Sequence, residues 1–97
     1  MFEIFWTHQS QSDFNRLKSD PSLQKRYKAV KKTIQLLASV PRHNSLQTHE
    51  FSSLKGSQGE KIFEAYAEQN TPAAYRVFWC YGPSKDQITI VAITRHT

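Results

Sequence analysis

The 97 residues of this chain suit one domain with a single hydrophobic core, because two domains would each be too small to bury enough apolar surface. Hydrophobic residues make up 38% of the sequence and aromatic residues 12%, which excludes a disordered chain and predicts one folded domain over residues 1–97. The 13 Lys and Arg outnumber the 8 Asp and Glu, and the resulting charge of +5 favours polyanionic partners such as RNA, DNA or an acidic protein.

The single cysteine bears on the cellular compartment. Cys80 cannot form an intramolecular disulfide, and no charged and then apolar leader precedes the first expected element. We therefore expect a cytoplasmic protein. No apolar run approaches the roughly 20 residues that a membrane-spanning helix needs, so no membrane role is expected.

The first half of the chain predicts a strand and two helices. Residues 2–6 form a short aromatic and β-branched run that is typical of a strand. Ser10 or Ser12 can cap a first helix that ends near Ser19. Over residues 20–40, an Asp-Pro start is followed by apolar residues at spacings of three and four, which predicts a second, amphipathic helix.

The second half predicts a loop and three strands. Residues 42–59 are polar and without periodicity, and we expect an ordered loop that wraps the sheet edge and tucks in Leu46, Phe51 and Leu54. Strand-like runs follow at residues 61–68, 73–81 and 87–94, joined by turns rich in Pro, Gly, Asn and Asp. The predicted fold is α+β with the order β-α-α-β-β-β, a helical hairpin packed on a small antiparallel sheet.

Arg76 is the least expected side chain of the strand at residues 73–81. A guanidinium in an otherwise apolar strand needs an anionic partner. One interpretation is structural, in which Arg76 pairs with Glu64 or Glu68 of the neighbouring strand. The other is functional, in which Arg76 holds a phosphate.

The end of the chain can contribute to the same site. Antiparallel pairing around residues 82–86 brings Arg76 opposite Ala92 or its neighbours, so that Arg76 can share a face with His96. A slip of one residue would put Arg95 in place of His96. An imidazole beside an arginine is suited to acid catalysis at a phosphate.

These residues carry a resemblance to a known family. The pattern consists of Leu54-Lys55-Gly56, Tyr75-Arg76-Val77-Phe78-Trp79, the strand at residues 88–93 and the closing Arg95-His96. Together with the helical hairpin before it, the pattern resembles the RelE/ParE superfamily of type II toxins, particularly its YoeB-like branch.

The resemblance implies an endoribonuclease that cleaves mRNA, on the ribosome or free, by attack of a ribose 2′-hydroxyl on the adjacent phosphate. It implies no metal or other cofactor, and a cognate antitoxin protein as partner. The reaction requires a base, cations at the phosphate and an acid. By similarity, Lys55 and Arg76 are the cations, His96 is the acid and Arg95 is an auxiliary cation.

The resemblance leaves the general base open. Glu50, shortly before the Leu-Lys-Gly motif, is the first candidate and Glu64 the second, with Tyr66 on the same strand face as Glu64. Lys61 and Tyr66 are candidate RNA contacts. The remaining histidines, His8, His43 and His49, are scattered and not at a zinc spacing.

Two alternative functions remain open from the sequence. The first is a ParE-like poison of DNA gyrase, which would act by binding a protein without the acid and base residues. The second is a catalytically silent, basic RNA-binding domain of the same fold.

Overall fold

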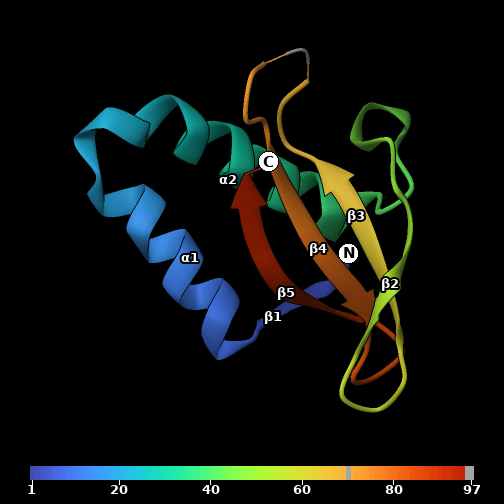
Figure 1. Ribbon diagram of the computed structural model, residues 1–97. Coiled ribbons are helices and arrows are strands. Elements are labelled where there is room, and N and C mark those ends of the chain that lie inside the picture. Colours follow the sequence, from blue (N-terminus) through green and yellow to red (C-terminus); the bar gives the residue numbers. More distant parts are fainter. Residues whose placement is uncertain (70, 96–97) are drawn as a thin grey trace.

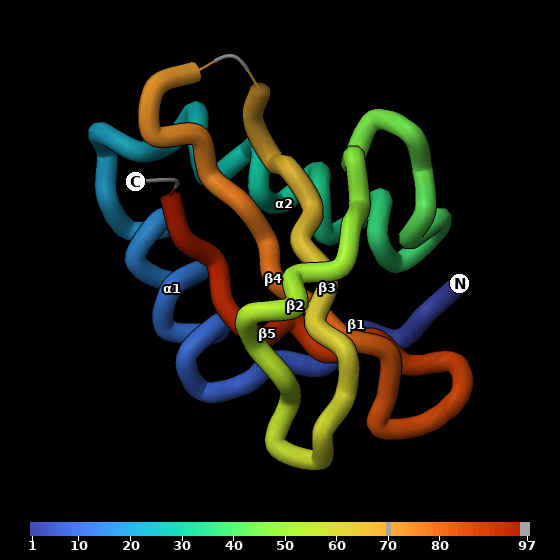
Figure 2. The backbone as a smooth tube through the Cα atoms, turned by 45° about the vertical axis from the view of Figure 1, so that its right-hand side comes forward, coloured from blue at the N-terminus to red at the C-terminus, as the bar shows by residue number. Residues whose placement is uncertain are grey.

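Two α-helices pack against one side of a five-stranded sheet in the computed structural model, which describes residues 1–69 and 71–95 (Figures 1 and 2). The expected α+β class is therefore confirmed. The elements are β1 (Glu3–Trp6), α1 (His8–Ser19), the 3-10 turn η1 (Pro21–Leu23), α2 (Gln24–Ser39), the 3-10 turn η2 (Asn44–Leu46), β2 (His49–Lys55), β3 (Lys61–Tyr66), β4 (Tyr75–Tyr81) and β5 (Gln87–Arg95).

Side-chain caps set where the helical segments begin. Thr7 and Ser10 form a capping box, in which each side chain accepts a hydrogen bond of 3.0 Å from the other's backbone N–H. Helix α1 therefore starts at His8, before the expected serine caps. Asp20 caps η1 by accepting from the backbone and hydroxyl of Ser22, and these bonds lower the pKa of its carboxyl. In the part of the chain described, no helix is long and apolar enough to cross a membrane.

The sheet has the strand order β1-β5-β4-β3-β2 and is mixed. Strands β2 to β5 pair antiparallel with their neighbours, whereas β1 runs parallel to β5. The expectation of a wholly antiparallel sheet was wrong, because the chain passes through both helices after β1 and its last strand returns beside β1 in the same direction.

The expectation of a loop over residues 42–59 was also wrong in part, because His49–Lys55 forms strand β2. This strand lies at the sheet edge, and nearly all of its side chains are exposed, so it lacks the apolar alternation that predicts a strand. Leu46 is buried as expected, whereas Leu54 is about half exposed.

One face of the sheet forms the core with the helices. The helices contribute Leu17, Val30, Ile34 and Leu37, and the strands contribute Phe63, Ala65, Val77, Trp79, Ile88, Ile90 and Ile93. Because side chains alternate along a strand, the residues between these point to the opposite face, which neither helix covers (Figure 2). We call this second face the helix-free face.

The pairing of β4 with β5 differs from the expected register by two residues. Arg76 lies opposite Thr94 rather than Ala92. The turn between the two strands pairs Tyr81 with Ile88, which shifts the register by one residue. A bulge at Val91 shifts it by one more.

Trp79 at the centre of the core gives a test of this packing. Its side chain is fully buried and stacked on Phe63, and its indole Nε1 has no hydrogen-bond partner among residues 1–69 and 71–95. We expect Trp79→Phe to lower the free energy of unfolding by less than about 1.5 kcal/mol, because the loss of volume is offset by removal of an unpaired N–H. Urea denaturation of the wild type and of Trp79→Phe measures this change in the free energy of unfolding. A loss as large as that of Trp79→Ala, about 3–5 kcal/mol, would contradict this description of the core.

Candidate active site

Four polar and aromatic side chains meet on the helix-free face. Strand pairing sets His49 opposite Glu64, and Tyr66 opposite Arg76. Glu64 and Tyr66 are two residues apart on β3, so their side chains point to the same side. We call His49, Glu64, Tyr66 and Arg76 the sheet-face cluster.

Glu64 is the buried centre of the cluster. One carboxylate oxygen, Oε2, accepts from Nη1 of Arg76 at 2.5 Å, and the other, Oε1, lies 2.7 Å from Nε2 of His49. The Glu64 side chain is only 2% exposed, whereas those of Arg76 and His49 are 20% and 48% exposed. One carboxylate below the surface therefore holds a cation and an imidazole that both reach solvent.

The two ring nitrogens of His49 both face acceptor oxygens. Nε2 lies against Glu64, and Nδ1 lies 3.1 Å from the backbone oxygen of Gln47. A doubly protonated ring can donate to both oxygens. Nδ1 contacts an exposed backbone carbonyl rather than the buried carboxylate, which makes it the ring nitrogen available to a substrate oxygen.

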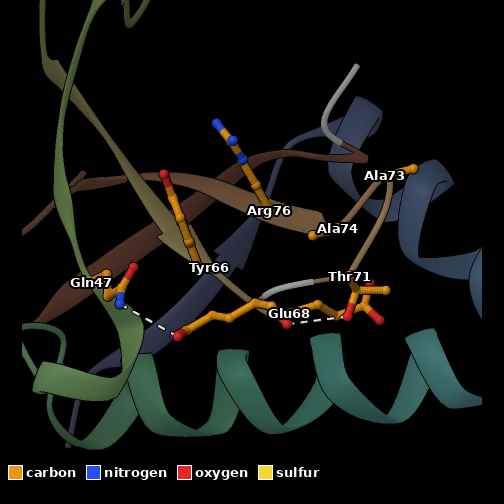
Figure 3. Close-up of a pocket in the computed structure, with 8 residues that line it drawn as sticks. Gln47, Tyr66, Glu68, Thr71, Ala73, Ala74 and Arg76 are labelled. Carbon is orange, nitrogen blue, oxygen red and sulfur yellow. Dashed lines mark hydrogen bonds between the residues drawn. The ribbon is translucent and has the colours of Figure 1, made fainter.

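Arg76 has hydrogen-bonding capacity left for an anion. A guanidinium carries five N–H donors, and the bond to Glu64 uses one of them. The guanidinium carbon also lies 4.8 Å from the centre of the Tyr66 ring. Figure 3 shows Tyr66 and Arg76 side by side, both projecting away from α2.

Three other candidate residues lie away from this cluster. Lys55 pairs with Lys61 at the start of β3, whereas Arg76 pairs with Tyr66 at its end. The length of β3, roughly 17 Å at about 3.4 Å per residue, therefore separates both lysines from Arg76. Glu50 pairs with Phe63, so it points to the other face than Glu64, and its carboxylate lies 3.6 Å from Lys55.

The candidate residues at the chain end are only partly described. Arg95 lies opposite Tyr75, the neighbour of Arg76, and therefore points to the other face of the sheet. Thr94 takes the position opposite Arg76. His96 lies outside the described residues.

Cys80 lies at the Lys55 end of the helix-free face, beside a cavity of about 480 Å³. Burial raises the pKa of the Cys80 thiol, and the nearby Glu60 carboxylate raises it further. Both effects disfavour the thiolate, which is the nucleophilic form of cysteine.

Neither the protein-family models nor the curated proteins contain a significant match to this sequence. Solved structures do match over nearly the whole chain. A YoeB/ParE toxin from Agrobacterium tumefaciens superposes with a TM-score of 0.71 at 14% identity, over 99% of this chain and all of the other. This chain has the RelE/ParE toxin fold.

Two further structures with this fold are similar to the chain. A chain of the archaeal RelE–RelB complex from Pyrococcus horikoshii gives a TM-score of 0.61 at 18% identity, covering 97% of this chain and 93% of that one. YafQ from Escherichia coli gives a TM-score of 0.62 at 15% identity, covering 99% of this chain and 94% of that one. The fold expected from the resemblance is therefore confirmed.

The two sides of the molecule differ in charge. The sheet-face cluster combines acidic and basic groups, whereas the outer surface of the helices is basic. Its exposed cations are Arg16, Lys18, Lys25, Lys28, Lys31 and Lys32. The acidic residue within α1, Asp13, is buried, and α2 contains none.

His49 is the residue of the cluster that sequence reasoning missed. In the sequence it is one of several scattered histidines and lies in the polar stretch that predicts a loop. A signal was present in the short polar segment before the Leu-Lys-Gly motif. This segment fits an edge strand that pairs antiparallel with residues 61–66. That pairing brings His49 opposite Glu64.

Proposed function

We propose that this chain is the toxin of a type II toxin–antitoxin system and that it cleaves mRNA as an endoribonuclease. The observation that carries the proposal is the sheet-face cluster, in which one buried carboxylate holds a solvent-reaching arginine and histidine. Its position on the uncovered face of a RelE/ParE fold leaves room for an RNA strand.

The reaction is an internal transfer at the phosphate. The 2′-oxygen of a ribose attacks the adjacent phosphorus, the bond from phosphorus to the 5′-oxygen breaks, and the products carry a 2′,3′-cyclic phosphate and a 5′-hydroxyl. The 2′-hydroxyl loses a proton to a base, and the leaving 5′-oxygen gains one from an acid. No net proton is consumed.

Three residues of the cluster take different roles. Arg76 binds the phosphate and stabilises the charge that develops on it, using the N–H groups that Glu64 does not occupy. His49 donates the proton to the 5′-oxygen through Nδ1. Glu64 is a positioning residue, because its buried carboxylate orients both of the others.

The remaining sequence candidates fit supporting roles in this proposal. His96, which the resemblance implies as the acid, stays a prediction, and His49 takes that role in this proposal. Glu50 has its carboxylate near Lys55 rather than the cluster, so it is less suited to be the base than the sequence suggested. Lys55 and Lys61 are suited to contact phosphates farther along the strand, where their charge favours RNA irrespective of base.

An antitoxin is the proposed protein partner. The solved relative from Pyrococcus horikoshii is a RelE–RelB complex. Strand β2 is an edge of the sheet, and its outer side pairs with no strand of residues 1–69 or 71–95. A partner that added a strand there would lie next to His49 and cover the cluster.

Cleavage by the purified protein tests the proposal. RNA, free and on programmed ribosomes, is incubated with the wild type and with the double variant Glu64→Gln/Arg76→Ala, which removes both charges of the ion pair together. We expect the double variant to cleave about 10²–10³ times more slowly, the effect of losing one charge-stabilising donor. The matched control is Arg16→Ala on the outer surface of α1. Intact RNA with inhibited DNA gyrase would instead favour the ParE-like alternative, and equal cleavage by both proteins would refute the assigned site.

A further inference from the structure

A cavity of about 370 Å³ opens beside the sheet-face cluster, where β3 ends and β4 begins (Figure 3). It has the size of ordinary small-ligand pockets. Its wall is mostly polar and includes Gln47, Tyr66, Glu68, Gln69, Thr71 and Arg76. The cavity therefore adjoins the phosphate-binding residue of the proposed reaction.

Backbone strain is concentrated at this cavity. Within residues 1–69 and 71–95, the two non-glycine residues with positive φ are Gln47, at 49°, and Ala73, at 56°, and both line the cavity. Such conformations are costly for residues with a side chain, and they gather at ligand-binding sites, where the surrounding structure holds them. Here Arg26 of α2 donates to the backbone oxygens of Pro72 and Ala73, at 3.3 and 2.7 Å, and fixes that wall.

A chain of hydrogen bonds fixes which way the Gln47 amide points. Gln69 Nε2 donates to the backbone oxygen of Ser45 at 2.9 Å, an oxygen that can only accept. Gln69 Oε1 is then left to accept from Gln47 Nε2 at 3.4 Å. The amide oxygen of Gln47, which has no partner among the described residues, turns toward Tyr66 in Figure 3. It is an acceptor presented to the cavity.

Apart from the Tyr66 hydroxyl and the guanidinium of Arg76, whose free N–H groups are assigned to the phosphate, the other polar groups around the cavity offer acceptors. The Thr71 hydroxyl donates its proton to the backbone oxygen of Gln69 at 3.2 Å, so toward a ligand it can only accept. Glu68 is a carboxylate, one oxygen of which accepts from the backbone of Tyr75 at 3.0 Å. A ligand with N–H donors on its edge therefore suits this wall, while the Tyr66 and Arg76 planes offer stacking surfaces.

We propose that this cavity is a base-recognition subsite that takes adenine or cytosine in preference to uracil. This inference rests on the proposed RNA cleavage and names the base next to the phosphate bound by Arg76. Adenine and cytosine each carry an exocyclic amine, which can donate to the amide oxygen of Gln47. Uracil presents a carbonyl oxygen in place of that amine, and this oxygen would face the acceptor.

The subsite is also linked to the proton donor of the proposed reaction. The backbone oxygen of Gln47 accepts from His49, while the Gln47 side chain lines the cavity. A base seated against Gln47 would thus place its own ribose and phosphate close to His49 and Arg76.

The test compares RNA oligonucleotides that differ only in the base beside the cleaved bond. We expect the wild type to cleave the adenine or cytosine substrate about 10 to 100 times faster than the uracil substrate, the discrimination of one good base contact. In Gln47→Gly this ratio should fall toward one. Glycine accepts positive φ readily, so this variant removes the acceptor without straining the backbone. The control is Gln35→Ala, on the exposed side of α2.

The outcomes distinguish a failure of the base-recognition subsite from a failure of the proposed RNA cleavage. Cleavage without base preference, or with a preference unchanged in Gln47→Gly, would overturn the subsite and leave the nuclease standing. If no substrate is cleaved, the proposed function fails, and fluorescence anisotropy with 2′-O-methyl oligonucleotides then decides the subsite. Tighter binding of adenine or cytosine oligomers, lost in Gln47→Gly, would support it, and equal binding of all three would refute it.

Discussion

Replacement of His49 by alanine is expected to slow RNA cleavage by a factor of about 10²–10⁴, the usual contribution of one positioned acid or base. The fold should be retained, because nearly half of the His49 side chain is exposed and it lies on an edge strand. The measurement is the cleavage rate of a defined RNA at saturating protein, with thermal unfolding as the check on structure.

Two further variants separate chemistry from position at His49. His49→Gln keeps an N–H that can donate to Glu64 but cannot transfer a proton, so it should be nearly as slow as His49→Ala. His8→Ala, at the exposed start of α1, should cleave like the wild type. A His49→Gln protein with nearly full activity would show that His49 acts only by supporting Glu64.

Removal of Arg76 is expected to destabilise the protein more than removal of the charge on its partner. Arg76→Ala leaves the Glu64 carboxylate, 2% exposed, with only His49 as a partner, and loss of one member of a buried pair costs about 3–5 kcal/mol. Glu64→Gln should cost less, because Arg76 reaches solvent and can be hydrated. Urea denaturation of both variants measures the difference.

The double variant completes this comparison. Glu64→Gln/Arg76→Ala should be more stable than Arg76→Ala alone, because it leaves no unpaired carboxylate below the surface. Stability losses that simply add would mean that Glu64 and Arg76 do not depend on each other, and would contradict the arrangement of the cluster.

The parts of the fold that bury apolar side chains were predictable from the sequence. The second helix and strands β3, β4 and β5 show clear periodicity, because each has one face in the core. Strand β2 was not predictable in this way, since an edge strand with exposed side chains leaves no apolar pattern. The parallel pairing of β1 depends on contacts between the chain ends, which local patterns do not contain.

The candidate site was predictable to a similar extent. Charge in an apolar strand pointed to Arg76, and pairing with the neighbouring strand offered Glu64 as its partner, which the ion pair confirms. The grouping of Lys55 with Arg76 came from short motifs, which do not specify that the two residues pair with opposite ends of β3. His49 reaches the cluster only because β2 pairs with β3. A sequence that does not predict β2 therefore cannot predict His49 as a member of the cluster.

The most direct test of the central claim, that the sheet-face cluster drives attack by a ribose 2′-hydroxyl, uses one modified substrate. The cleavage position is mapped on an all-ribose RNA, and the nucleotide on its 5′ side is then replaced by the 2′-deoxy form. We expect cleavage at that position to disappear, and the products of the unmodified RNA to carry 2′,3′-cyclic phosphate and 5′-hydroxyl ends by mass spectrometry. Equal cleavage of the deoxy substrate, or products with 5′-phosphate ends, would contradict the claim.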